Sequence, residues 1–94
     1  MHKLTIKVCG GVHDAFEVWV WMFFYQEAAF KYAREYLDRI RDSVGRGITY
    51  SVSSNKWHKV DNTWTMSATT YASSEDKKGT FIIFTIEKTK EEFK

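Results

Sequence analysis

The sequence has no proline, one cysteine and five glycines among its 94 residues. The single cysteine, Cys9, cannot form a disulfide within the chain, so no disulfide framework holds the fold. The longest apolar run, Val18 to Tyr25, covers eight residues, which is too short for a helix that spans a bilayer. No positively charged start is followed by an apolar run and a cleavage site, so we expect a reducing, cytoplasmic setting and no membrane association.

The chain also lacks an excess of one charge, because 14 Lys and Arg face 12 Asp and Glu, for a net charge of +2. This balance argues against a dedicated nucleic-acid binder with a strongly basic face, although a local basic patch remains compatible with it. A chain of this length can bury roughly 60 to 65% of its unfolded surface. We therefore expect a single domain over residues 1–94 that folds without a metal, and we predict no cofactor.

Aromatic side chains are abundant, with 4 Trp, 5 Tyr and 7 Phe. Residues 27–44 show the spacing of an amphipathic helix, and the apolar positions that recur at steps of three and four are Phe30, Ala33, Leu37, Ile40 and Val44. The opposite side of this segment is charged, and Gly45 and Gly47 follow it as helix-ending residues. The stripe predicts one helix that lies on a sheet.

The remaining segments have the alternating pattern of strands. They are residues 3–9, 16–24, 48–60 with a bend at 53–55, 63–71 and 80–87. The first two are predicted to form a hairpin across Gly10 and Gly11, and a helix from Asp14 onward is the alternative for the second. The predicted fold is α+β, an antiparallel sheet of about five strands in the order β-β-α-β-β-β, with one amphipathic helix packed on one face. Residues 88–94 are predicted to be a charged tail, frayed or briefly helical.

One helix covers only one face of a sheet, and two of the predicted strands are apolar on both sides. In residues 16–24, one side carries Phe16, Val18, Val20 and Met22 and the other carries Trp19, Trp21 and Phe23. Large uncovered apolar areas on small proteins usually mark interfaces. We assign a partner-binding surface to Trp19, Trp21, Phe23, Phe81 and Ile83. The alternative is a curled sheet, or loops that fold across the second face to make a second small core.

A second constellation combines basic and aromatic groups around the turn at Asp61 and Asn62. Rings that stack on bases beside lysines that neutralise phosphate are typical of single-strand nucleic-acid and nucleotide binders. The residues that would form such a site are Lys56, Trp57, Lys59, Trp64 and Arg46. The alternative is a cross-strand pair of Trp57 and Trp64, with lysines that keep a sheet edge soluble.

The remaining reactive residues do not form a recognisable site. Histidine and cysteine lack the paired spacing of a closed zinc site, the candidates being His2, Cys9 and His13. A catalytic group could be assembled from Ser54, His58 and Asp61, but no nucleophile elbow, phosphate loop or carboxylate pair accompanies it. We therefore predict no metal site and no enzymatic activity, with a small enzyme of unrecognised site as the last alternative.

The sequence favours a non-enzymatic protein-binding module that acts by stoichiometric binding or occlusion of a partner. It is also expected to form a homodimer that covers the apolar face. In size and economy the chain is similar to the small inhibitors that phages direct against bacterial defence systems, anti-CRISPR proteins among them. No motif carries this likeness, so it implies no site residue. A nucleotide or single-stranded nucleic-acid binder is the second hypothesis.

Overall fold

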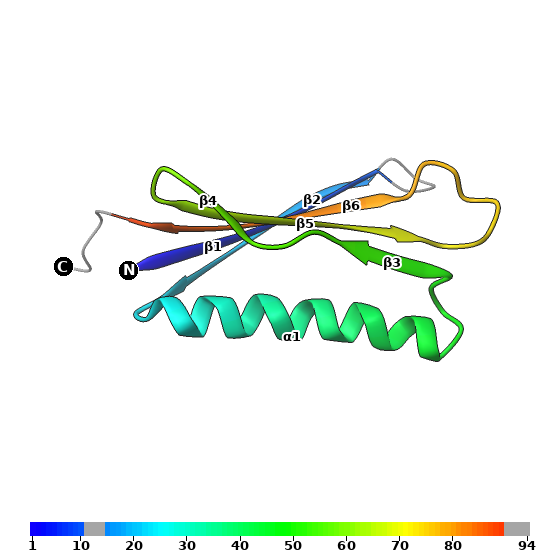
Figure 1. Ribbon diagram of the computed structural model, residues 1–94, viewed down its shortest axis with the longest axis horizontal. Helices are drawn as coiled ribbons and strands as arrows, with labels where there is room; N and C mark the ends of the chain where they lie inside the picture. The colour runs from blue at the N-terminus through cyan, green and yellow to red at the C-terminus, as the bar shows by residue number, and fades with distance from the viewer. Residues whose placement is uncertain (11–14, 90–94) are drawn as a thin grey trace.

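The computed structural model describes residues 1–10 and 15–89, so Gly11 and His13 in the predicted turn and the tail residues 90–94 lie outside the described residues. It is an α+β fold in which a six-stranded antiparallel sheet carries one helix on one face (Figure 1), in the order β-β-α-β-β-β-β. The predicted fold class is confirmed. The elements are β1 (His2–Gly10), β2 (Ala15–Phe23), α1 (Gln26–Gly45), β3 (Ser51–Ser54), β4 (His58–Val60), β5 (Thr63–Tyr71) and β6 (Thr80–Lys88).

The strand order across the sheet is β2-β1-β6-β5-β3, and β4 also pairs with β5. The predicted bent strand over residues 48–60 is therefore two short strands, β3 and β4, which pair with successive parts of β5. Between them, Asn55 bonds to Ser67 through its backbone and its side chain. Its backbone amide donates to the Ser67 carbonyl at 3.0 Å, its side-chain carbonyl accepts from the Ser67 amide at 2.8 Å, and its side-chain amide donates to the Ser67 hydroxyl at 2.9 Å. One edge of the sheet is thus the unbroken strand β2, and the other is the interrupted pair β3 and β4.

The helix begins one residue before the predicted segment and ends one residue after it. Its N-cap, Tyr25, makes no side-chain capping bond, in keeping with the weak capping chemistry of Gln26 and Glu27. At the other end Gly47 adopts a φ of 76°, a left-handed conformation that favours glycine, and its amide donates to the Val44 carbonyl at 3.1 Å. This turn reverses the chain toward β3.

The core lies between α1 and one face of the sheet. Ala29, Ala33 and Leu37 are the buried residues of the helix, and the two alanines let its backbone lie close to the strands. The sheet contributes buried residues at alternate positions of β1, β5 and β6: Leu4, Ile6, Met66, Ala68, Ile82, Phe84 and Ile86. This alternation follows the period of two expected for half-buried strands.

Aromatic rings fill the space on both sides of this alanine seam. On the β2 side, the Tyr32 ring lies 4.7 Å from that of Trp21 and 5.8 Å from that of Phe23, centroid to centroid. On the β5 side, the Phe30 ring lies 4.8 Å from Trp57 and 5.6 Å from Trp64. Much of the aromatic content is therefore taken up within the fold.

The register of the sheet decides which residues face the helix. Trp21 pairs with Leu4 and Trp19 pairs with Ile6, and directly paired residues point to the same face. Trp19, Trp21 and Phe23 consequently lie on the helix side, whereas Phe81 and Ile83 alternate with the buried Ile82 and Phe84 and lie on the other. The prediction that these five residues share one uncovered face is wrong, because strand alternation alone does not show which set meets the helix.

Candidate functional site

The side of the sheet opposite α1 is called the open face here. Every β2 residue on it is exposed, with exposed fractions of 67% for Phe16, 44% for Val18, 49% for Val20 and 37% for Met22. Two residues of β6 extend this area, because Phe81 is 49% exposed and Ile83 is partly exposed. The open-face patch comprises Phe16, Val18, Val20, Met22, Phe81 and Ile83.

Polar side chains of β1 run through the patch on the same face, and those of β5 border it. The strand between β2 and β6 places Lys3, Thr5 and Lys7 on the open face, while β5 contributes Thr63, Thr65, Ser67 and Thr69. Cys9 pairs with both Phe16 and Phe81, so one end of the patch is a continuous apolar corner. An apolar area that is crossed by lysines and bordered by hydroxyl groups has the mixed composition of a protein interface.

The β2 edge is also apolar on the helix side. Trp19 is 49% exposed there, and its ring stacks on that of Trp21 at 6.4 Å. The predicted partner-binding residues thus divide into three groups. Trp21 and Phe23 pack under the helix, Trp19 is exposed at the edge, and Phe81 and Ile83 belong to the open-face patch. On β2, the residues exposed on the open face are therefore Phe16, Val18, Val20 and Met22. From the sequence, the alternate residues Trp19, Trp21 and Phe23 had instead been assigned to the partner-binding surface.

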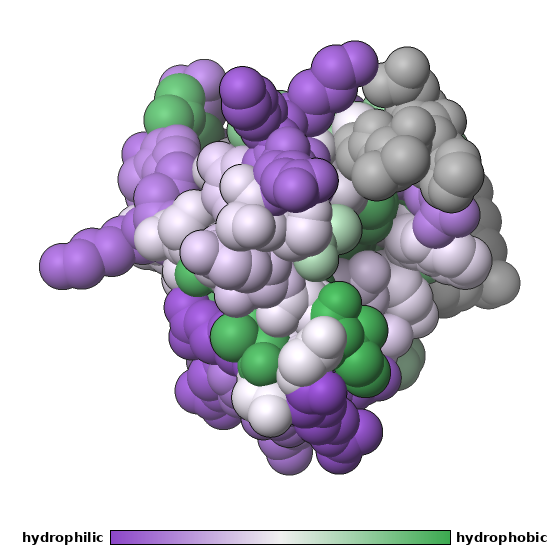
Figure 2. Space-filling model, turned by 90° about the vertical axis from the view of Figure 1, so that its right-hand side faces the viewer, coloured by the Kyte–Doolittle hydropathy of each residue, from purple (hydrophilic) through white to green (hydrophobic). Residues whose placement is uncertain are grey.

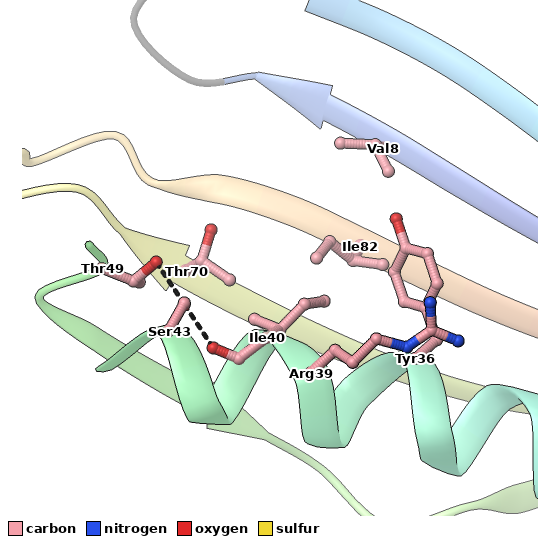
Figure 3. Close-up of a pocket in the computed structure, with 8 residues that line it drawn as sticks. All are labelled: Val8, Tyr36, Arg39, Ile40, Ser43, Thr49, Thr70 and Ile82. Carbon is pink, nitrogen blue, oxygen red and sulfur yellow. Dashed lines mark hydrogen bonds between the residues drawn. The ribbon is translucent and has the colours of Figure 1, made fainter. Parts of the chain in front are cut away.

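A cavity of about 360 Å³ lies between the second half of α1 and the sheet. Figure 3 shows apolar walls formed by Val8, Ile40 and Ile82, with polar groups around them from Tyr36, Arg39, Ser43, Thr49 and Thr70. The Ser43 hydroxyl donates to the Ile40 carbonyl, and the hydroxyls of Ser43 and Thr49 share a hydrogen bond of 2.6 Å. Figure 2 looks at this end of the molecule, where apolar surface adjoins charged side chains near the end of α1. The volume is at the lower end of the range for small-molecule pockets.

Among the residues that line this cavity, Tyr36 has a shifted pKa. Burial raises the pKa of its hydroxyl above the ordinary value, the negative charges of Glu17 and of an ionised Tyr32 raise it further, and Arg39 lowers it. Its ring packs edge-on against Phe84 at 5.8 Å. A tyrosine with a raised pKa stays protonated at neutral pH, so it can donate a hydrogen bond but is a poor base.

The predicted nucleic-acid site is only partly assembled. Trp57 and Trp64 are half-buried and each makes an edge-type contact with Phe30, so part of each ring is used in packing within the fold. Lys59 lies 5.6 Å above the Trp64 ring, a cation–π arrangement within the protein. Arg46 follows the other end of α1, about 24 Å along the helix from Phe30 at 1.5 Å per residue, so it does not join the group.

The structure separates the residues that could have formed a catalytic group. Ser54 pairs with Ala68 and so lies on the helix side, where its hydroxyl accepts from the Arg41 guanidinium at 2.7 Å. His58 pairs with Thr65 and lies on the open face, and Asp61 occupies the turn after β4 with a φ of 56°. Within residues 1–10 and 15–89, no cluster of three or more His, Cys, Asp or Glu could hold a metal ion. In the described part of the chain, no helix is long and apolar enough to cross a membrane.

Comparison with known proteins gave no match to a protein-family model, to a curated protein or to a solved structure. The candidate site therefore follows from the chemistry of the surface alone. The open-face patch and the exposed edge of β2 hold six of the eleven large hydrophobic residues that are exposed in the described part of the chain, and we take them as the candidate site.

Proposed function

We propose that this protein is a non-enzymatic binding domain that associates stoichiometrically with a partner protein through the open-face patch. The observation that carries the proposal is the exposure of all four open-face residues of β2, on the same face as Phe81 and Ile83 of β6, across β1. Full burial of one large apolar side chain contributes about 1.5 to 3 kcal/mol. A partner that covers Phe16, Val18 and Phe81 would therefore gain several kcal/mol from these side chains alone.

The chemistry of the patch sets what the partner must offer. The patch has two apolar parts, on β2 and on β6. The lysines at positions 3 and 7 lie between these parts on β1, and the hydroxyls of β5 border the β6 part. Lys3 already pairs with Glu87 at 3.7 Å, whereas Lys7 is exposed. The matching surface is an apolar protrusion with an acidic group positioned to meet Lys7.

One specific version of this proposal is that the protein is an inhibitor. It would bind a larger complex, such as a bacterial defence complex, and cover the surface with which that complex acts. The support is an exposed apolar patch on a domain whose described residues assemble no recognised catalytic group. In this form, the partner's activity is expected to fall in proportion to occupancy of the patch.

The test is affinity purification of the full chain from its native host with quantitative mass spectrometry. The Val18→Ser/Phe81→Ser variant removes apolar surface from the patch. The Thr63→Ala/Thr65→Ala variant is the control, since it alters the same face on β5. We expect one protein to be retained in fixed ratio by the wild type and the control and to be lost with the patch variant. Retention of the same proteins by all three chains would refute the proposal.

Nucleotides released from the same purified samples are analysed in parallel, because nucleic-acid binding is the alternative function. Its support is now limited to the exposed lysines Lys56 and Lys59, since the two tryptophans pack within the fold. Nucleotide or oligonucleotide retained by the wild type and lost in a Lys56→Ala/Lys59→Ala variant would favour that function over protein binding.

A further inference from the structure

Strand β2 is an unprotected edge. It extends over nine residues at one end of the strand order, and no other described segment pairs with its outer side. Natural edge strands are usually short or carry lysine, proline or a bulge, which prevent pairing with other chains. β2 carries a single charge, at Glu17, and is apolar on both faces.

The opposite edge of the same sheet has the protection that β2 lacks. It consists of a four-residue strand and a three-residue strand, interrupted at Asn55. The Asn55 amide donates to the Ser67 carbonyl at 3.0 Å, the Asn55 side chain bonds to Ser67 through both its oxygen and its nitrogen, and regular strand pairing resumes only at His58. Most exposed positions along this edge are polar or basic, among them Ser53, Lys56 and Lys59, and Val60 is the exposed apolar residue of its two strands. An incoming strand would find no continuous ladder on this side.

We propose that the outer edge of β2 pairs antiparallel with the β2 edge of a second copy of this chain, so that two sheets join into one. A β2 edge that joined the β3 and β4 edge of another copy would leave a free edge at each end and would form open filaments. Pairing of two β2 edges about a twofold axis closes after two copies. The asymmetry between the two edges of the sheet therefore selects a dimer.

The length of β2 sets the register of this pairing. Residues 15–23 are symmetric about Trp19, so a twofold axis at Trp19 overlaps all nine residues. This register places Phe16 opposite the partner's Met22 and Val18 opposite the partner's Val20, with open-face residues meeting open-face residues. In an antiparallel ladder of this length, about eight to ten backbone hydrogen bonds join the two strands.

The interface is small, which sets the expected affinity. The exposed parts of Phe16, Val18, Trp19, Val20 and Met22 amount to roughly 400 Å² per copy, given about 150 to 250 Å² for a whole aromatic side chain. A standard interface buries about 800 Å² per partner. We therefore expect dissociation in the micromolar range. The joined sheet also merges the two open-face patches, but the pairing does not depend on the partner protein proposed above.

The first experiment measures the oligomeric state of the full chain by sedimentation velocity between about 1 and 200 µM. The Val18→Lys/Val20→Lys variant sets lysine against lysine in the proposed register, and Val18→Glu/Val20→Glu sets acid against acid. We expect a dimer for the wild type, a monomer for each variant alone and a dimer for their equimolar mixture. The control is Thr63→Lys/Thr65→Lys on β5, which adds the same charge to the open face away from the edge and should leave the dimer intact.

The second experiment distinguishes edge pairing from two open faces packed together. Trp19→Cys in a Cys9→Ser chain places a single thiol at the twofold axis on the helix side, within reach of its counterpart. Glu17→Cys in the same background is the control, because the two copies of residue 17 lie about 14 Å apart along the paired strands. A short bifunctional maleimide should cross-link the residue 19 variant at least tenfold faster than the residue 17 variant.

The outcomes decide the proposal. A dimer with charge-swap rescue and selective cross-linking at residue 19 supports it. A monomer at all concentrations, a dimer lost in the β5 control, or equal cross-linking at residues 17 and 19 overturns it. If the charge variants do not fold, as judged by circular dichroism, the cross-linking comparison decides alone, since Trp19 is half-exposed and its replacement leaves the core in place.

Discussion

Replacement of Trp21 by alanine tests which side of β2 belongs to the core. Trp21 lies opposite Leu4 on the helix side, and its ring is 4.7 Å from that of Tyr32. Removal of a fully buried Trp side chain costs about 3 to 5 kcal/mol. Trp21 is only partly buried, so we expect a loss of about 2 to 3 kcal/mol in the free energy of unfolding, of which about 0.5 to 1.5 kcal/mol comes from the aromatic pair.

This loss is large for a domain of this size. At about 0.05 to 0.15 kcal/mol per residue, the whole chain has a free energy of unfolding of roughly 5 to 14 kcal/mol. Urea denaturation followed by far-UV circular dichroism measures the change. With an m-value of about 1 to 1.3 kcal/mol/M, the midpoint should fall by about 2 M.

Val20→Ala is the matched control, because Val20 is the adjacent residue and points to the open face, where it is 49% exposed. We expect this variant to lose less than about 1 kcal/mol, from strand propensity and partial burial. A midpoint shift for Val20→Ala equal to or larger than that for Trp21→Ala would refute the assignment of faces.

Three further predictions concern the helix, the cavity and a loop glycine. Leu37→Ala should cost about 2 to 5 kcal/mol by chemical denaturation, since Leu37 is buried at the centre of the helix contact. For Tyr36, a folded-state pKa above the ordinary 10.0 means that the folded state holds its proton longer, so stability falls as the pH rises past 10. Tyr36→Phe should therefore lose less stability than the wild type between about pH 9 and pH 11, as followed by thermal unfolding at each pH. Gly79→Ala should lower the Tm by at least about 4 °C, because Gly79 has a φ of 69° and an added Cβ would lie 2.9 Å from Thr69 Cγ2; an unchanged Tm would contradict this reasoning.

The elements of the fold could be predicted from the sequence because their patterns are local. The helix stripe, the Thr-rich strand that became β5 and the hairpin of β1 and β2 all follow from the spacing of apolar residues. The break at Asn55 was visible only as a bend, and the structure turns it into the boundary between β3 and β4. Local pattern therefore predicts the order of elements, whereas the count of strands depends on long-range bonds to Ser67.

The candidate site was harder to predict, for two reasons. Both sides of β2 are apolar, and the choice between them depends on the register with β1, which the sequence does not reveal. The expected helix stripe also omitted Tyr32 and Tyr36, whose rings widen the covered area and engage Trp21 and Phe84. The two tyrosines are four positions apart, and each follows three positions after one of the buried alanines Ala29 and Ala33. This helical spacing was the signal for a wider stripe.

The strand order has a consequence for how the chain reaches its folded state. β6 is the last described strand in the sequence, yet it lies between β1 and β5 and pairs with both. The earlier elements therefore present two unsatisfied strand edges to the cell until β6 is synthesised. Long-range pairing of this kind is slow and exposes apolar segments to aggregation. The domain should complete its sheet only after residues 80–88 have emerged from the ribosome, and a chain truncated before Thr80 should be insoluble rather than partly active.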